Sequence, residues 1–298
     1  MFTGQCMVAS VLDGKACASS VEESLSPRID NCIKSGITPH LAVVIVGDDP
    51  ASHVYVNAKI RACNRLRIKS SHIQLPESAL EIELREVIEN LNHDVEVHGI
   101  LIQSPLPNHM NEEALTDLID PRKDVDGFHP VNLGRLVQSR QDSLIPCTPN
   151  GVMRLLDWAK IPTAGKTALV VGRSRNVGMP MAILLASRGA DATVTIAHSR
   201  TSEIKAQCQQ ADILVAAVGR PNMIKKSWIK SGAVVIDVGI NRVDDASDSR
   251  GYVLIGDVEK STSEIASWIT PVPGGVGPMT VAMLMENTVK AAESKIQW

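Results

Sequence analysis

The chain has 298 residues, of which 44% are hydrophobic, and a formal net charge of −3 with a pI near 6.2. This length and composition allow substantial cores and are typical of two domains. The charge gives no reason to expect nucleic acid or an anionic membrane as a partner, and no apolar run approaches the ~18 residues that span a bilayer.

The N-terminal segment and the cysteines indicate where the protein works. Met1–Ser26 has Lys15 as its single basic residue and lacks a continuous apolar stretch, which argues against a secretory signal or transit peptide. The six cysteines form no Cys-x-x-Cys, and the eight histidines show no metal-ligand spacing. We expect reduced, mostly buried thiols, a cytoplasmic protein and no metal.

Strand and helix patterns alternate through the first half of the chain. Short apolar runs predict strands, and longer runs with helical periodicity predict helices. Such alternation is typical of βαβ units with a parallel sheet. The expected strands are Leu41–Gly47, Ile68–Leu75 and Val97–Gln103, and the expected helices are Ala51–Leu66, Ala79–Asn92 and Asn111–Ile119.

A polar stretch with glycine and proline, Pro121–Pro149, then interrupts the pattern and predicts a domain boundary. A second αβ series follows, so we predict an α/β protein with domains at residues 1–149 and 150–278. The elements expected after the boundary are helix Gly151–Lys160, strands Ala168–Gly172, Ala192–Ala197, Asp212–Gly219, Ala233–Gly239 and Val253–Gly256, and a final helix Met279–Ser294.

The strand Ala168–Val171 leads into a glycine-containing turn and then an apolar helical run to Ser187. Such a turn directs backbone N–H groups and a helix N-terminus at a phosphate. The spacing is not G-x-G-x-x-G, and strand–helix turns often contain glycine without binding a ligand. We predict that the phosphate-binding residues are Gly172, Arg173, Ser174, Val177 and Gly178.

The end of the next strand indicates which nucleotide binds. NAD-selective domains usually place an acidic residue there, whereas this chain has His198, Ser199 and Arg200. An arginine and hydroxyl groups suit the additional phosphate of NADP. Asp191 precedes the strand and is badly placed to bind a ribose. The alternative for Arg200 is a solvated surface charge.

Later strands also end in glycine, at Gly219 and Gly239. Ligands of open α/β sheets lie at the carboxyl ends of the strands, so we expect both glycines to line the cofactor. Ile240 would form an apolar wall for the nicotinamide. A purely structural role remains the alternative for Gly219.

The segment Pro271–Thr280 reads Pro-Val-Pro-Gly-Gly-Val-Gly-Pro-Met-Thr. Proline restricts φ, and glycine permits positive φ and close approach of a ligand. We predict a shaped loop that enters a helix at Pro278 or Met279. A structural turn is the alternative, but few ordinary turns need so many restricted positions.

Four polar or aromatic residues suggest a chemical site. Tyr55 and Lys59, four residues apart, share one helix face, Gln103 ends a strand, and Asp126 lies in the interdomain stretch. Spacing alone favours an amphipathic pair for the first two. They also match the Tyr/Lys pair of short-chain dehydrogenases superficially, but that pair follows the nucleotide fold, and this one precedes it.

These motifs together resemble the bifunctional methylenetetrahydrofolate dehydrogenase/methenyltetrahydrofolate cyclohydrolase family, from about Ala9 to Glu293. The resemblance implies a Rossmann-like NADP-binding domain with a parallel sheet, an active-site cleft between the two domains, a first domain completed by helix 279–298, and a homodimer through the nucleotide-binding domain. Ser104, where the family has an apolar residue, and Arg175, which the family pattern usually lacks, depart from it.

The resemblance also implies the reaction: oxidation of methylenetetrahydrofolate by NADP, then hydrolysis of the methenyl product to formyltetrahydrofolate at the same site. Lys59 would transfer protons, which requires a lowered pKa. Gln103 would orient it, Tyr55 would stack on the aminobenzoate, and Asp126 would bind the pterin. The further residues implied are Pro273, Gly274, Gly275 and Val276 for folate and Thr280 for the cofactor.

Two alternatives remain at this point. One is a monofunctional NAD(P)-dependent dehydrogenase that lacks cyclohydrolase activity, and the other is a non-catalytic nucleotide-binding protein. The combination of Lys59, Gln103 and Asp126 argues against the first, because simple alcohol oxidation does not need a pterin-binding carboxylate. An intact Lys59 with polar partners from separate segments argues against the second.

Overall fold

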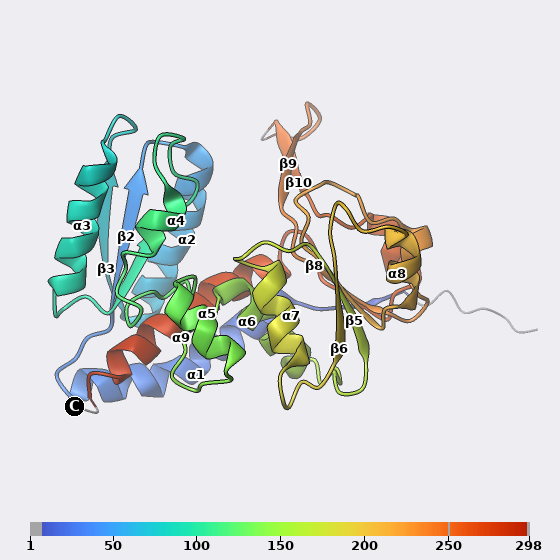
Figure 1. The fold of residues 1–298 in the computed structure, drawn as a ribbon, viewed down its shortest axis with the longest axis horizontal. Helices are drawn as coiled ribbons and strands as arrows, with labels where there is room; N and C mark the ends of the chain where they lie inside the picture. Colours follow the sequence, from blue (N-terminus) through green and yellow to red (C-terminus); the bar gives the residue numbers. More distant parts are fainter. Residues whose placement is uncertain (1–7, 250, 297–298) are drawn as a thin grey trace, which may run out of the picture. The chain divides into compact units, whose positions relative to one another are not determined.

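The computed structural model describes residues 8–249 and 251–296. These residues form two compact units, which we name by their sheets and describe separately. The six-stranded unit comprises the described residues up to Ala18 together with Thr148–Thr280. The three-stranded unit comprises Ser19–Cys147 and the described residues from Val281 (Figure 1).

The three-stranded unit is a small parallel sheet in the order β3–β2–β4. Every residue of β2 is buried, as expected for a continuous apolar strand covered on both faces. Helices α2 and α3 cover opposite faces (Figure 1). The elements from the start of the chain to this unit's last short helix are β1 (Ser10–Val11, in the other unit), α1 (Gly14–Lys34), β2 (His40–Val46), α2 (Pro50–Leu66), β3 (Lys69–Leu75), α3 (Glu81–His93), β4 (Gly99–Ile102), α4 (Glu112–Thr116) and α5 (Pro130–Val137).

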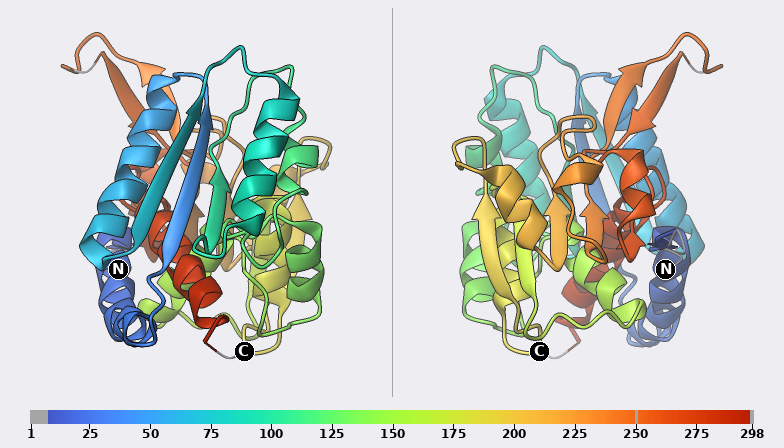
Figure 2. Two further views of the ribbon diagram at one scale, coloured as in Figure 1. Left: turned by 90° about the vertical axis from the view of Figure 1, so that its left-hand side faces the viewer. Right: turned by 90° about the vertical axis from the view of Figure 1, so that its right-hand side faces the viewer.

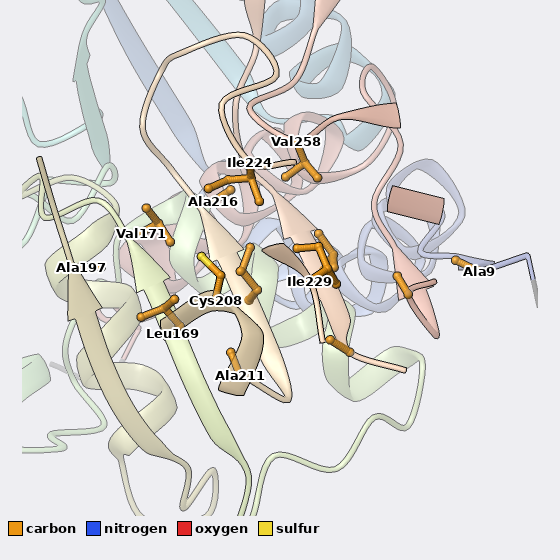
Figure 3. Packing of buried hydrophobic residues seen from close by; sticks show 14 residues of the cluster. Ala9, Leu169, Val171, Ala197, Cys208, Ala211, Ala216, Ile224, Ile229 and Val258 are labelled. Carbon is orange, nitrogen blue, oxygen red and sulfur yellow. The ribbon is translucent and has the colours of Figure 1, made fainter. Parts of the chain in front are cut away.

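The six-stranded unit has a parallel sheet in the order β1–β11–β8–β7–β5–β6. Figure 3 shows the hydrophobic core on one face of this sheet, where Leu169 and Val171 of β5 and Ala216 of β7 belong to the same cluster as Cys208 of α8. The elements are α6 (Cys147–Trp158), β5 (Thr167–Val171), α7 (Gly178–Ala186), β6 (Thr193–Ala197), α8 (Ile204–Gln210), β7 (Ile213–Ala216), β8 (Val234–Asp237), β9 (Asn241–Asp244), β10 (Tyr252–Ile255) and β11 (Trp268–Ile269), with short 3₁₀ turns at Lys226–Trp228 and Lys260–Glu264. Helix α9 (Val276–Glu293) begins in this unit and belongs to the three-stranded unit from Val281.

The α/β fold class predicted from the sequence is confirmed, and each predicted strand overlaps an observed one. The strand expected at Val253–Gly256 lies in a different sheet from the one predicted. It pairs antiparallel with β9 in a separate two-stranded ribbon that extends outward from the six-stranded sheet (Figure 2). Residues of β10 are only half-buried. The Arg242 guanidinium of β9 lies 4.1 Å from the Tyr252 ring centre of β10, and this cation–π contact between the two strands stabilises the ribbon.

The N-terminal segment departs from the predicted domain 1–149. Strand β1 pairs with β11, so the described residues up to Ala18 belong to the six-stranded unit. The long helix α1 was not predicted, because its weakly amphipathic sequence contains Pro27. Helix α5 was also not predicted, because it lies inside the polar stretch that we interpreted as a boundary.

Helix α9 begins at Val276, earlier than the predicted Pro278 or Met279. Pro278 lies in the first turn, where backbone N–H groups have no partner within the helix, so a proline is tolerated there. Further along the same helix, in the three-stranded unit, Asn287 is buried. Its amide donates to the carbonyls of Val125 (2.8 Å) and Ile145 (2.9 Å), which fixes the 125–145 segment against the helix.

The five described cysteines are free and buried, and Cys6 lies outside the described residues. Within residues 8–249 and 251–296, none of the helices combines the length and the apolar character needed to cross a membrane. The same residues contain no cluster of histidine, cysteine or acidic side chains suited to a metal ion.

Candidate functional site

A lysine and a glutamine form the centre of the candidate site in the three-stranded unit. Lys59, on α2, is half-buried, and its Nζ donates to Oε1 of Gln103 at 2.9 Å. The Gln103 backbone N–H donates to the Val44 carbonyl (2.8 Å), which extends the β2–β4 pairing, and its Nε2 donates to the Ser104 carbonyl (2.7 Å). With the amide nitrogen committed to Ser104, the amide oxygen has to face Lys59.

Two charged groups influence each other beside this hydrogen bond. Burial lowers the pKa of Lys59 from its ordinary value, while the charges of Asp126 and Cys147 oppose that change. Burial raises the pKa of Asp126 to about 6, with the Lys59 charge opposing. The buried Cys147 thiol donates to the Val125 carbonyl (3.2 Å), and burial raises its pKa well above the ordinary value. A lysine with a lowered pKa is suited to accept and return protons near neutral pH.

The neighbouring carboxylate, Asp124, has a structural role that the sequence analysis missed. It is 1% exposed and accepts hydrogen bonds from the backbone N–H groups of Gly127 (3.1 Å) and His129 (2.8 Å) and from the Asn132 side chain (2.9 Å). These bonds fix the turn that presents Asp126. In Asp124-Val125-Asp126 the first carboxylate therefore orders the backbone, while the second lies within the electrostatic reach of Lys59.

Ser104, one of the two departures from the family pattern, takes part in the same loop. Its hydroxyl donates to Oε1 of Glu112 at 2.6 Å, and the Leu106 N–H donates to the other oxygen at 3.4 Å. Glu112 on α4 therefore holds the loop that follows Gln103. A hydrogen bond takes the place of an apolar contact, and sequence reasoning did not single out Glu112.

Tyr55 lies one helical turn before Lys59 and is 45% exposed. An exposed aromatic ring on the face that carries the reactive amine is available for stacking on a flat ligand. Tyr55, Lys59, Gln103 and Asp126 thus all belong to the three-stranded unit, and the last three are linked by a hydrogen bond or by charge.

The predicted phosphate-binding turn lies in the six-stranded unit, between β5 and α7. Gly172 has φ +130°, and a Cβ on Gly178 would lie 2.2 Å from the Gly172 carbonyl oxygen, so the turn requires glycine at both positions. The Ser174 hydroxyl accepts from the N–H groups of Val177 (3.2 Å) and Gly178 (3.3 Å) at the start of α7. Arg173 is exposed beside this turn.

The turn after β6 lies at the same edge of the sheet. Strands β5 and β6 pair in parallel with Val171 opposite Ala197, and the Gly172 N–H donates to the Ala197 carbonyl at 2.8 Å. The turn is closed by the His198 N–H, which donates to Thr201 Oγ1 at 2.9 Å, and it leaves Ser199 and Arg200 exposed. A cation, a hydroxyl and a helix N-terminus at one sheet edge fit a nucleotide with an additional phosphate.

The remaining predicted residues border a small crevice in the same unit. Gly239 and Ile240, which is 38% exposed, line it together with Pro271–Gly277. Pro273, Gly274, Gly275 and Val276, which the resemblance assigned to folate, are therefore in the six-stranded unit, unlike Lys59. A Cβ on Gly14 would lie 1.6 Å from the Gly275 carbonyl oxygen, so the start of α1 packs directly on this loop.

Thr280 and Gly219 complete the predicted set. The Thr280 hydroxyl lies 2.9 Å from the Thr148 hydroxyl, in hydrogen-bond contact. Gly219 follows β7 with φ +63°, a conformation that favours glycine. Asp191 lies before β6, where its carboxylate accepts from the Gly189 N–H at 3.1 Å, away from the end that carries Arg200.

A Rossmann-type unit with a glycine turn at a helix N-terminus, together with a unit that holds a lysine against an amide and a carboxyl, defines a nucleotide-dependent dehydrogenase with an acid–base group. Comparisons with known proteins identify the family. The tetrahydrofolate dehydrogenase/cyclohydrolase catalytic domain matches residues 12–126, and the NAD(P)-binding domain of the same family matches residues 146–296.

Similar proteins extend over nearly the whole chain. The bifunctional protein FolD of Acetivibrio thermocellus is 54% identical over 96% of this chain and 98% of its own length, and that of Moorella thermoacetica is 52% identical over 96% and 99%. The crystal structure of the bifunctional enzyme FolD from Campylobacter jejuni superposes with a TM-score of 0.91 at 44% identity, covering 96% and 99% of the two chains. The Trypanosoma brucei dehydrogenase-cyclohydrolase complexed with NADP and inhibitor gives 0.92 at 37%, covering 97% and 99%. The chain belongs to the tetrahydrofolate dehydrogenase/cyclohydrolase family.

The raised pKa of Asp126 predicts how this residue affects stability. The unfolded carboxyl loses its proton near its ordinary value of 3.8 and the folded one near 6, so the cost of ionising the carboxyl is absent below about pH 4 and complete above about pH 6. We expect Asp126→Asn to raise the free energy of unfolding by about 1–3 kcal/mol at pH 8 and to change it little at pH 4.

Urea unfolding of the variant and the wild type at both pH values measures this difference. Asp124→Asn is the matched control: it should destabilise the protein at pH 8, because its carboxylate accepts backbone hydrogen bonds. An Asp126→Asn variant that is less stable than the wild type at pH 8 would contradict the prediction.

Proposed function

We propose that this protein oxidises methylenetetrahydrofolate with NADP and hydrolyses the resulting methenyltetrahydrofolate to formyltetrahydrofolate, with Lys59 as the proton-transfer residue. The observation that carries the proposal is the hydrogen bond from Lys59 to Gln103 on an amine whose pKa burial lowers. The relatives that match nearly all of the chain are bifunctional proteins, which favours both activities over a monofunctional dehydrogenase.

The hydrolysis makes specific demands on Lys59. Water adds to the methenyl carbon while the neutral amine accepts a proton from that water, and the ammonium returns a proton to the ring nitrogen as the C–N bond breaks. The remaining hydroxyl proton leaves to solvent as the formyl C=O bond forms, so the hydrolysis releases one proton. The first step needs the neutral amine and the second needs its ammonium form, and burial lowers the pKa of Lys59 in the direction that favours this exchange. Gln103 holds the amine in one position by accepting a hydrogen bond from it, and the Ser104 carbonyl holds the amide of Gln103 by accepting from its Nε2.

The other groups of the three-stranded unit position the folate. Asp126 accepts hydrogen bonds from the amino and ring N–H groups of the pterin, a planar pair of donors that suits a carboxylate. The exposed ring of Tyr55 stacks on the aminobenzoate. The proposal also includes Pro273, Gly274, Gly275 and Val276, which belong to the six-stranded unit, as folate-binding residues.

The six-stranded unit binds NADP, which accepts a hydride from the one-carbon bridge when it is bound. The backbone N–H groups at the start of α7, with Gly172, Ser174, Val177 and Gly178, hold the pyrophosphate. Arg173, His198, Ser199 and Arg200 hold the additional phosphate, and the exposed Arg200 follows β6 where NAD-selective domains have an acidic side chain. Gly219, Gly239, Ile240 and Thr280 line the rest of the cofactor.

We also propose a cytoplasmic homodimer that associates through the six-stranded unit. Strand β6 is an edge strand, paired with β5 alone, and an edge strand offers backbone groups to a second copy. The five free thiols among the described residues suit a reducing compartment. Sedimentation equilibrium should give about twice 32.1 kDa, and a monomer mass at micromolar concentration would contradict the proposal.

Replacing Lys59 tests the division between the two reactions. We expect Lys59→Met to lower the hydrolysis rate of methenyltetrahydrofolate by about 10²–10⁴-fold, because the proton-transfer group is lost, and to spare more of the NADP reduction. The decay of the methenyl absorbance and the appearance of NADPH measure the two activities separately. Lys69→Met, an exposed lysine of the same unit, is the control and should change neither.

An equal loss of both activities in Lys59→Met would remove the proposed role from Lys59. Hydrolysis at the wild-type rate in this variant would point to a different proton-transfer group. Reduction of NADP by the wild type without any methenyl decay would mean a monofunctional dehydrogenase.

Replacing Arg200 tests the nucleotide assignment. We expect Arg200→Ala to raise the KM for NADP by about 10- to 100-fold, because a hydrogen bond between ionised groups is lost. The KM for NAD, which lacks the additional phosphate, should stay nearly unchanged. Initial-rate measurements with each nucleotide give both constants. Arg188→Ala, an exposed arginine before β6, is the matched control, and an equal effect of the two substitutions would argue for a general charge effect.

A further inference from the structure

A fully buried carboxylate connects the loops at the carboxyl end of the six-stranded sheet. Asp257 is 0% exposed, and its Oδ2 accepts from the N–H groups of Val218 (2.7 Å) and Gly219 (2.9 Å). Its Oδ1 accepts from the Arg220 N–H (2.9 Å) and from Nδ2 of Asn241 (2.9 Å). Three successive backbone N–H groups after β7 and one side chain that follows β8 thus converge on a single carboxylate.

This arrangement depends on a side chain that accepts hydrogen bonds through both of its oxygens. A buried polar group is costly unless hydrogen bonds replace its water, and here four donors do so. The positive φ of Gly219 turns its N–H toward Asp257 together with those of Val218 and Arg220. An asparagine of the same shape would direct its NH₂ group at some of these N–H groups, so two donors would face each other and the loop after β7 would have to move.

A second buried carboxylate, Asp237 at the end of β8, holds Asp257 in place. Its Oδ1 accepts from the N–H groups of Asp257 (2.9 Å) and Gly239 (3.0 Å), and its Oδ2 accepts from the Val258 N–H (2.9 Å). A Cβ on Gly239 would lie 2.3 Å from the Asp257 carboxylate, so the segment after β8 packs directly against it. The backbone at Gly219 is therefore held by Asp257 and the backbone at Gly239 by Asp237, and the two residues are joined by the hydrogen bond from the Asp257 N–H to the Asp237 carboxylate.

We propose that Asp257 is a positioning residue for NADP: its carboxylate holds Gly219 and the Gly239–Ile240 segment in the arrangement that receives the cofactor. The inference rests on the proposed function, which assigns these glycines and Ile240 to the cofactor. Asp257 itself is buried and acts through the backbone that it holds.

The two activities separate this role from a general contribution to folding. Hydrolysis of methenyltetrahydrofolate transfers no hydride and depends on Lys59, which belongs to the other unit. A misplaced loop after β7 or β8 should weaken NADP binding and leave hydrolysis intact. A loss of folded protein would lower both activities together.

The test is Asp257→Asn in the full chain. We expect the KM for NADP to rise at least about 10-fold, since one or more hydrogen bonds to a charged group are lost, and the hydrolysis rate per folded molecule to stay within about 2-fold. The melting temperature, measured in parallel, gives the folded fraction. Asp212→Asn is the control: this carboxylate, at the opposite edge of the same sheet, accepts from the Thr167 N–H and Lys230, so the KM for NADP should not change.

An unchanged KM for NADP in Asp257→Asn would overturn the inference, as would a parallel fall of both activities. If this variant does not fold, Asn241→Ala removes one of the four donors. It should raise the KM for NADP by a smaller factor, about 3- to 10-fold, and an unchanged value would again overturn the inference. A wild type with neither activity would instead refute the proposed function.

Discussion

The hydrogen bond between Lys59 and Gln103 makes conflicting demands that the three-stranded unit has to satisfy. In the proposed function the amine has to lose its proton readily, and burial lowers its pKa, yet a carboxyl lies within its electrostatic reach and favours the charged form. Asp126 is buried as well, which raises the pKa of that carboxyl to about 6, while the Lys59 charge opposes this rise. Neither pKa can be understood without the other, because each group is the main charge acting on its partner.

The six-stranded unit meets a different requirement, which is to hold the backbone of the loops after its strands in a fixed conformation. Glycines at positions 172 and 178 leave no room for a side chain, and Ser174 closes the turn with its own hydroxyl. Where the lysine site needs a tuned side chain, this unit needs N–H groups held in fixed directions. Carboxylates are well suited to that work because one carboxylate accepts several N–H groups, as Asp124 does in the other unit.

The sequence alone was enough to predict the α/β class and the βαβ alternation, because these depend on local patterns and on glycine and proline. Helix α1, with its internal Pro27, and α5, inside a polar stretch, escaped prediction because their helicity depends on packing. The pairing of β9 with β10 is a tertiary contact that periodicity does not contain. Asp124, Glu112 and Asp257 were not identified as organising groups, since a lone acidic residue in sequence does not show which backbone groups it faces. A Gly-Asp pair directly after a strand, as at Gly256-Asp257, is a signal that could have singled out the last of these.

The way the chain is divided between the units also constrains how the protein is made. Each unit combines two distant stretches: the described residues up to Ala18 join Thr148–Thr280, and Ser19–Cys147 joins the residues from Val281. A growing chain therefore cannot complete the three-stranded unit until the part of α9 from Val281 is synthesised. In the six-stranded unit, β1 has no strand to pair with until β11 is made at Trp268–Ile269. Each unit can therefore be completed only after its later stretch has been synthesised, long after its earlier stretch. A cut at the apparent domain boundary near residue 149 would separate parts of both units.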